Sequence, residues 1–139
     1  MDIRPVDDSI AVAPQLQPED MVALAAQGYT AVICNRPDGE DPGQPGVAEM
    51  RAAAEAVGLA FHHIPVSGGQ FPEAAVAAFR AVRKGTPGKV LAYCRTGTRC
   101  MTLDTLAKAD ETTADVLIDR AAKAGYDLSA MRDRLIGQD

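Results

Sequence analysis

One short segment holds the residues of this sequence that are best suited to chemistry. It follows the apolar run 89–93, precedes a helical pattern that begins near Arg99, and reads Cys94-Arg95-Thr96-Gly97-Thr98-Arg99. A loop between a strand and a helix directs backbone N–H groups inward and adds the positive end of the helix dipole. Such an environment lowers the pKa of a thiol, and the thiolate is the nucleophile. We therefore predict Cys94 as a nucleophile at the rim of an anion-binding loop.

The other residues of this loop are predicted to hold the anion. Gly97 lets the backbone curl where a side chain would clash, and Arg99 presents a planar guanidinium that matches a tetrahedral oxyanion. Arg95, Thr96 and Thr98 complete the predicted anion-binding and substrate-binding loop. The alternative interpretation is a packed structural cysteine at the end of a strand, with solvated arginines.

The accessory candidates are two further cysteines and a polar loop. Cys100 directly follows the loop, where it acts as a weak S–H donor, traps Cys94 in a disulfide on oxidation, or packs at the start of a helix, and packing is favoured. Cys34 ends a predicted strand, and a core role is favoured for it. Arg36 and Asp38 come just after that strand, and they either reach the site or pair with each other.

The two histidines do not indicate a metal site. His62 and His63 are adjacent, so they fall on alternate faces of a strand, and ordinary packing or exposure is favoured over catalysis. No Cys-x-x-Cys pair accompanies them. The sequence therefore predicts no metal and no cofactor.

Strand-like and helix-like segments alternate along the chain. The predicted strands are 9–13, 30–34, 59–66 and 89–93, and the predicted helices are 18–28, 47–57, 72–82, 99–109, 112–124 and 128–136. A loop rich in Pro and Gly, 35–45, follows the second strand, at the end where α/β proteins place ligand contacts. This alternation predicts one three-layer α/β domain over residues 1–139, with a mostly parallel central sheet of four to five strands flanked by helices.

Composition and charge exclude several classes of function. The 139 residues carry a formal net charge of -5, which argues against a protein that binds nucleic acid or an anionic membrane. The start of the chain lacks the apolar core of a secretory signal, and no apolar stretch is long enough to cross a bilayer. An odd set of three cysteines is not a secreted disulfide framework. We expect a cytoplasmic protein whose partners are a small sulfur or phosphate substrate and a thiol protein; its oligomeric state stays open.

Several segments together resemble one bacterial family. These segments are 35–40, 42–45, 63–66, 94–99 and 125–127. The family is the phosphatase-like one whose members also occur fused to beta-lactamase-hydrolase-like proteins and to sulfide-oxidising enzymes. The resemblance implies the fold of small dual-specificity tyrosine phosphatases, and an activity that is either a phosphatase or a sulfurtransferase activity.

Two local features favour sulfur transfer. Four residues separate Cys94 from Arg99, a spacing similar to that of rhodaneses, whereas cysteine phosphatases have five. The loop 67–70 carries no acid, and a poor leaving group needs a general acid that contributes ~10²–10⁴-fold. Asp38, Glu40 or Asp41 would substitute for that acid if the loop 35–45 folds over the site.

Three functions are therefore weighed, all centred on Cys94. The favoured prediction is a sulfurtransferase, in which the thiolate takes the outer sulfur of a persulfide or thiosulfonate donor and passes it to a thiol. The alternative is a tyrosine-phosphatase-like phosphatase with a phosphocysteine intermediate. The third is a non-catalytic persulfide carrier or anion-binding module.

Overall fold

The computed structural model describes residues 1–136, which form an α/β domain around one five-stranded sheet. The strand order is β1-β2-β5-β3-β4, with β2, β5, β3 and β4 parallel and β1 antiparallel to β2. The predicted α/β class and mostly parallel sheet are confirmed. The strands are β1 (Arg4–Asp7), β2 (Ile10–Ala13), β3 (Tyr29–Cys34), β4 (Ala60–His63) and β5 (Lys89–Tyr93).

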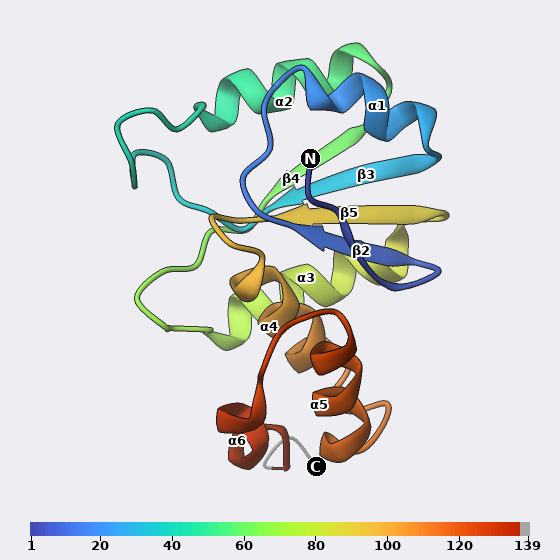
Figure 1. Ribbon diagram of the computed structural model, residues 1–139, viewed down its shortest axis with the longest axis vertical. Coiled ribbons are helices and arrows are strands. Elements are labelled where there is room, and N and C mark those ends of the chain that lie inside the picture. Colours follow the sequence, from blue (N-terminus) through green and yellow to red (C-terminus); the bar gives the residue numbers. More distant parts are fainter. Residues whose placement is uncertain (137–139) are drawn as a thin grey trace.

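Helices cover both faces of this sheet. Figure 1 shows α1 and α2 on one face, α3 and α4 on the other, and α5 and α6 beyond α4. The layers are those expected when a parallel sheet needs both of its apolar faces covered. The helices are α1 (Asp20–Ala26), α2 (Val47–Ala56), α3 (Glu73–Gly85), α4 (Thr98–Ala107), α5 (Ala114–Lys123) and α6 (Arg132–Ile136), with a 3-10 turn at Ser129–Met131.

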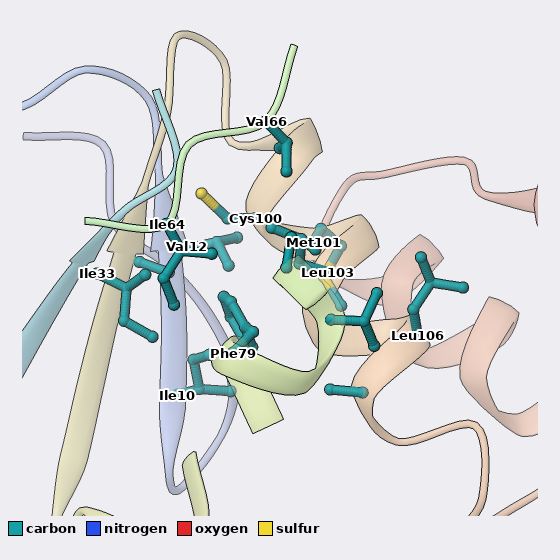
Figure 2. Packing of buried hydrophobic residues seen from close by; sticks show 14 of the residues in the cluster. Ile10, Val12, Ile33, Ile64, Val66, Phe79, Cys100, Met101, Leu103 and Leu106 are labelled. Carbon is teal, nitrogen blue, oxygen red and sulfur yellow. The ribbon is translucent and has the colours of Figure 1, made fainter. Parts of the chain in front are cut away.

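The strands next to the centre are buried on both faces, so the sheet separates two apolar cores. The core under α3, α4 and α5 contains Ile10, Ile33, Phe79 and Leu103, among the side chains drawn in Figure 2. The second core contains side chains of α1, α2 and the other sheet face. This packing holds the carboxyl ends of four parallel strands at one edge, from which the loops after β3, β4 and β5 project (Figure 1).

The structure differs from the predicted elements mainly at the ends of the chain and at β4. Residues Arg4–Asp7 form an edge strand that was not predicted. Only alternate residues of an edge strand face the core, so this segment is too polar to stand out as a strand. The strand predicted over 59–66 is only Ala60–His63, although the N–H groups of Ile64 and Val66 still donate to the carbonyls of Cys34 and Asn35 beyond it. The single helix predicted over 128–136 is a 3-10 turn followed by α6.

Several helix ends also differ, and α1 and α5 are each shorter at both ends than predicted. The helix predicted to end at Val82 continues to Gly85, so its last turn includes Arg83 and Lys84, which favour the negative end of the helix dipole. Helix α4 ends at Ala107, two residues before the predicted end. Within residues 1–136, no helix is long and apolar enough to cross a membrane.

Candidate active site

Backbone hydrogen bonds fix the start of the 94–99 loop between two neighbouring strand ends. The N–H of Cys94 donates to the carbonyl of Ala13 at 3.3 Å, and the N–H of Asn35 donates to the carbonyl of Tyr93 at 2.9 Å. Because β2, β5 and β3 are parallel, these contacts bring the loops after all three strands to one edge of the sheet. The nucleophile predicted from the sequence therefore lies at the carboxyl edge of the sheet.

Cys94 is poised to be a thiolate. The S–H of Cys100 is the largest influence that lowers the pKa of Cys94, and the backbone N–H groups of Cys100, Thr96 and Gly97 act in the same direction. Together they outweigh burial and bring this pKa to about 5. The N–H of Gly97 donates directly to Sγ at 3.1 Å. At neutral pH the sulfur is therefore an anion held by donors, the state required of a nucleophile.

Cys100 keeps its own proton. It is the third residue of α4 and is fully buried. Figure 2 labels it among the side chains of the core on this face of the sheet. Burial first, and then the neighbouring Cys94 sulfur, raises the pKa of the Cys100 thiol well above its ordinary value. Its place in the core fits the packing role, and its thiol also lowers the pKa of Cys94.

Gly97 has two reasons to be glycine. Its φ of 93° lies in the left-handed region, and a Cβ there would stand 2.1 Å from the hydroxyl oxygen of Tyr126. The Tyr126 hydroxyl donates to the carbonyl of Thr96 at 3.2 Å. Tyr126 thus supports the loop from a distant part of the chain. The residue types gave no sign of this role, apart from its place in the 125–127 segment of the family resemblance.

Arg99 binds a carboxylate with both terminal nitrogens. Nη1 and Nη2 donate to the two oxygens of Glu40 at 2.9 and 2.8 Å, and Nη1 also donates to the carbonyl of Val66 at 2.9 Å. The Arg99 guanidinium is the main reason that the pKa of Glu40 falls to about 2. The loop after β3 therefore does fold over the site, and Glu40 is the acid that it places against Arg99.

Arg36 holds the same loop through several hydrogen bonds of its side chain. It is 3% exposed, and its guanidinium donates to Glu40, to Asp41 and to the side-chain oxygen of Gln15. Asp41 also lies 3.5 Å from Nε of the exposed Arg95. We call this group of five the loop cluster: Arg36, Glu40, Asp41, Arg95 and Arg99.

The two accessory residues predicted in this loop separate. Arg36 joins the loop cluster, whereas a carboxylate oxygen of Asp38 accepts the N–H of Val47 at 2.8 Å, at the start of α2. The two residues do not pair with each other. Spacing alone did not distinguish Asp38 from Glu40, since each is a few residues beyond the end of the strand. Thr96 and Thr98 contact each other through their hydroxyls at 3.1 Å.

Three residues beside the loop cluster support its backbone. The thiol of Cys34 donates to the carbonyl of Arg36 at 3.4 Å, and burial raises the pKa of this thiol. A ring nitrogen of His63 lies 3.0 Å from the same carbonyl. Asn35, wholly buried and not singled out from the sequence, donates to the carbonyl of Ile64 at 2.8 Å and so ties the ends of β3 and β4 together.

Solved structures of phosphatases share this fold. A crystal structure from Neisseria meningitidis, described as a candidate phosphatase, is 37% identical, covers 100% of this chain and 99% of its own, and superposes with a TM-score of 0.87. The core catalytic domain of a PP-IP phosphatase from S. cerevisiae superposes with a TM-score of 0.69 at 16% identity, over 97% of this chain and 83% of its own. At that identity the likeness concerns the fold alone.

One curated relative is a much longer protein than this chain. The beta-lactamase hydrolase-like protein of Agrobacterium fabrum is 40% identical over 104 residues, which are 75% of this chain and 24% of that protein. The chain therefore spans about a quarter of the length of this relative.

The predicted sulfurtransferase activity is wrong on these findings, which point to a phosphatase-like function. It relied on the spacing between Cys94 and Arg99 and on the acid-free loop 67–70. Both are local features, whereas the whole chain superposes on a phosphatase-like structure at 37% identity. The family model that matches residues 2–111 is that of the beta-lactamase hydrolase-like protein, phosphatase-like domain. The chain belongs to this family.

Proposed function

We propose that this protein is a phosphatase that hydrolyses phosphoryl compounds through a phosphocysteine at Cys94. The observation that carries the proposal is the Cys94 sulfur, which accepts the N–H of Gly97 at 3.1 Å and has a pKa of about 5, at the start of a loop that ends in Arg99. The 37% identical phosphatase-like structure and the family description support the same activity.

The chemistry has two displacements at phosphorus. In the first, the Cys94 thiolate forms an S–P bond while the bond between phosphorus and the leaving oxygen breaks, and that oxygen takes the electron pair. In the second, water forms a P–O bond, the S–P bond breaks, and the thiolate is restored as inorganic phosphate departs with the proton balance made by solvent. Backbone N–H groups of the loop and the Arg99 guanidinium stabilise the charge on the equatorial oxygens in both steps.

The loop cluster gives the site its attraction for anions in an acidic chain. Its three arginines and two carboxylates leave one positive charge, which offsets the Cys94 thiolate. A locally balanced site of this kind, with backbone N–H donors in the Cys94 loop, receives a phosphoryl dianion more readily than the net charge of -5 suggests.

The test is capture of the intermediate. The protein is mixed with 4-nitrophenyl phosphate, quenched in acid within milliseconds, and the peptide that contains Cys94 is weighed by mass spectrometry. We expect the added mass of one phosphoryl group on Cys94, and steady release of 4-nitrophenolate. Cys94→Ser should abolish both signals, whereas Cys34→Ala, which removes another buried thiol, should retain them. Turnover that survives Cys94→Ser contradicts the proposal.

A further inference from the structure

Glu40 is the carboxylate that contacts Arg99, and its guanidinium partners bear on which substrates the site can serve, an inference that rests on the proposed phosphatase function. When the P–O bond breaks, the leaving oxygen becomes negative. An alkoxide needs a proton from a general acid at that moment, whereas a carboxylate or another weak base does not. The positions of Glu40, Asp41 and Asp38 therefore decide which leaving groups the site can serve.

Glu40 is an acceptor at both of its oxygens. Oε1 accepts Nη2 of Arg99 at 2.8 Å and Nε of Arg36 at 2.8 Å, and Oε2 accepts Nη1 of Arg99 at 2.9 Å. These contacts place three N–H donors on one carboxylate and hold its pKa at about 2. A carboxylate in this state carries no proton at neutral pH to give to a leaving group.

The two neighbouring carboxylates are also engaged. Asp41 accepts from the guanidinium of Arg36 and lies 3.5 Å from Arg95, between two fixed cations. Asp38 caps the start of α2 by accepting the N–H of Val47. Asp41 therefore faces two guanidinium groups, and Asp38 is engaged at the start of α2.

The other wall of the site is uncharged. A cavity of about 440 Å³ lies between the loops after β3 and β4 and is lined by Pro37, Pro65, Val66, Ser67, Gln70 and Pro72. It adjoins Arg99, because the Val66 carbonyl accepts from that guanidinium. This lining suits the organic part of a substrate and offers it proline rings, a hydroxyl and an amide, but no carboxyl group.

We propose that the substrates carry their phosphoryl group on a weakly basic oxygen, as in a mixed carboxylic–phosphoric anhydride, and that alkyl phosphates are not substrates. The Cys94 thiolate attacks phosphorus, the P–O bond to the acyl oxygen breaks, and a carboxylate leaves with the electron pair and needs no proton. Water then displaces the Cys94 thiolate, itself a weakly basic leaving group. Both displacements proceed without a general acid.

The test is the dependence of kcat/KM on the basicity of the leaving group. The substrates are acetyl phosphate, 4-nitrophenyl phosphate, phenyl phosphate and glycerol phosphate, with the rate of Cys94→Ser subtracted for spontaneous hydrolysis. We expect kcat/KM to fall roughly tenfold for each unit of leaving-group pKa, the steep dependence of a reaction without an acid. Glycerol phosphate should give no turnover above the Cys94→Ser background.

Variants separate this inference from the proposed function. Asp41→Asn and Glu40→Gln should keep the same steep dependence whatever their absolute rates, and Glu49→Gln, which changes an exposed carboxylate of α2 outside the loop cluster, serves as the matched control. A flat dependence, or one that becomes steep only in Asp41→Asn, overturns the inference while a phosphocysteine still forms. If no substrate gives a phosphocysteine, the proposed function fails, and the inference fails with it.

Discussion

Two groups of arginines and aspartate or glutamate side chains stand in different parts of this molecule and are built differently. One is the loop cluster above the Cys94 loop. The other, which we call the buried cluster, joins β1, α3, α4 and α5 and consists of Asp7, Arg83, Asp104 and Arg120. Asp104 is at its centre, with Nε of Arg83 and Nη1 of Arg120 each 2.8 Å from one of its carboxylate oxygens.

The two clusters differ in exposure and in charge. The Asp104 side chain is 1% exposed, whereas those of Glu40 and Asp41 are 26% and 44% exposed. The buried cluster has two cations and two anions, while the loop cluster has three cations and two anions. A neutral, closed network holds elements together, and an open one with an excess positive charge remains able to attract an anion.

The largest effect expected from this difference is on stability. Asp104→Ala leaves the guanidinium groups of Arg83 and Arg120 without their buried partner, and removing one member of a buried pair costs about 3–5 kcal/mol. Asp41→Ala breaks contacts that are partly exposed, which are worth less than about 1 kcal/mol. Urea unfolding measures both free energies. Equal losses would show that the two clusters do the same structural work.

The next effect concerns the thiolate. Replacing Cys100 by Ala removes the S–H donor with the largest influence on the pKa of Cys94, so that pKa should rise from about 5 by roughly one unit, or about 1.4 kcal/mol. The thiolate is present above its pKa. At any pH between 5 and 6, iodoacetamide should therefore alkylate Cys94 several-fold more slowly in Cys100→Ala than in the wild type. Cys100→Ser retains a donor and should change the profile little. An unchanged profile in Cys100→Ala would assign the low pKa to the backbone N–H groups alone.

The sequence predicted the parts of the site that depend on local structure. Cys94, Gly97 and Arg99 were identified because they lie in one short loop between a strand and a helix. Such a loop brings its own backbone N–H groups together whatever the rest of the chain does. The partner of Arg99 was not identified, because the distance from Glu40 to Arg99 depends on how an eleven-residue loop rich in Pro and Gly folds across the sheet edge. The same limit applies to Tyr126, which meets Gly97 only through tertiary packing.

The buried cluster shows this limit for the fold. Asp104 sits in a helix whose neighbouring residues are nearly all buried, and its helical position gave no indication that Arg83 and Arg120 would converge on it. The edge strand that supplies Asp7 was missed for a similar reason. Its four residues are polar enough to read as a loop until β2 pairs with them. The alternation of strands and helices, by contrast, needs only local patterns, and it predicted the sheet.

A smaller effect should follow from charge in the loop cluster. Both Nη groups of Arg99 already donate to Glu40, so a phosphate ion competes with a fixed carboxylate for that guanidinium. Glu40→Gln removes this negative charge while keeping the shape of the side chain. Inhibition by inorganic phosphate should tighten by roughly threefold to tenfold, the scale of one close charge near a protein surface. Asp38→Asn, which alters a helix cap instead, should leave the inhibition constant unchanged. Weaker phosphate binding in Glu40→Gln would mean that Glu40 holds Arg99 in the shape that receives the anion.

The smallest effect is the response to acid, in which the two clusters should behave alike. Each cluster contains a carboxyl group whose pKa is lowered. In the buried cluster it is Asp7, whose ordinary pKa is 3.8; burial raises this pKa, but hydrogen bonds from Ser9 and Arg120 outweigh it. In the loop cluster it is Glu40, whose pKa falls from 4.5 to about 2. A lowered pKa contributes stability that is complete above the ordinary value and is lost as the pH falls toward the folded one. The stability difference between the wild type and Asp7→Asn should therefore be constant above about pH 5 and shrink below pH 4, by less than about 1 kcal/mol for a partly exposed pair. Urea unfolding at pH 3, 4 and 6 measures it. Because the pKa of Glu40 is also lowered, the corresponding difference for Glu40→Gln should shrink on acidification too, beginning at a slightly higher pH since its ordinary pKa is 4.5. A difference that grows on acidification in either variant would contradict the sign argued for that carboxylate.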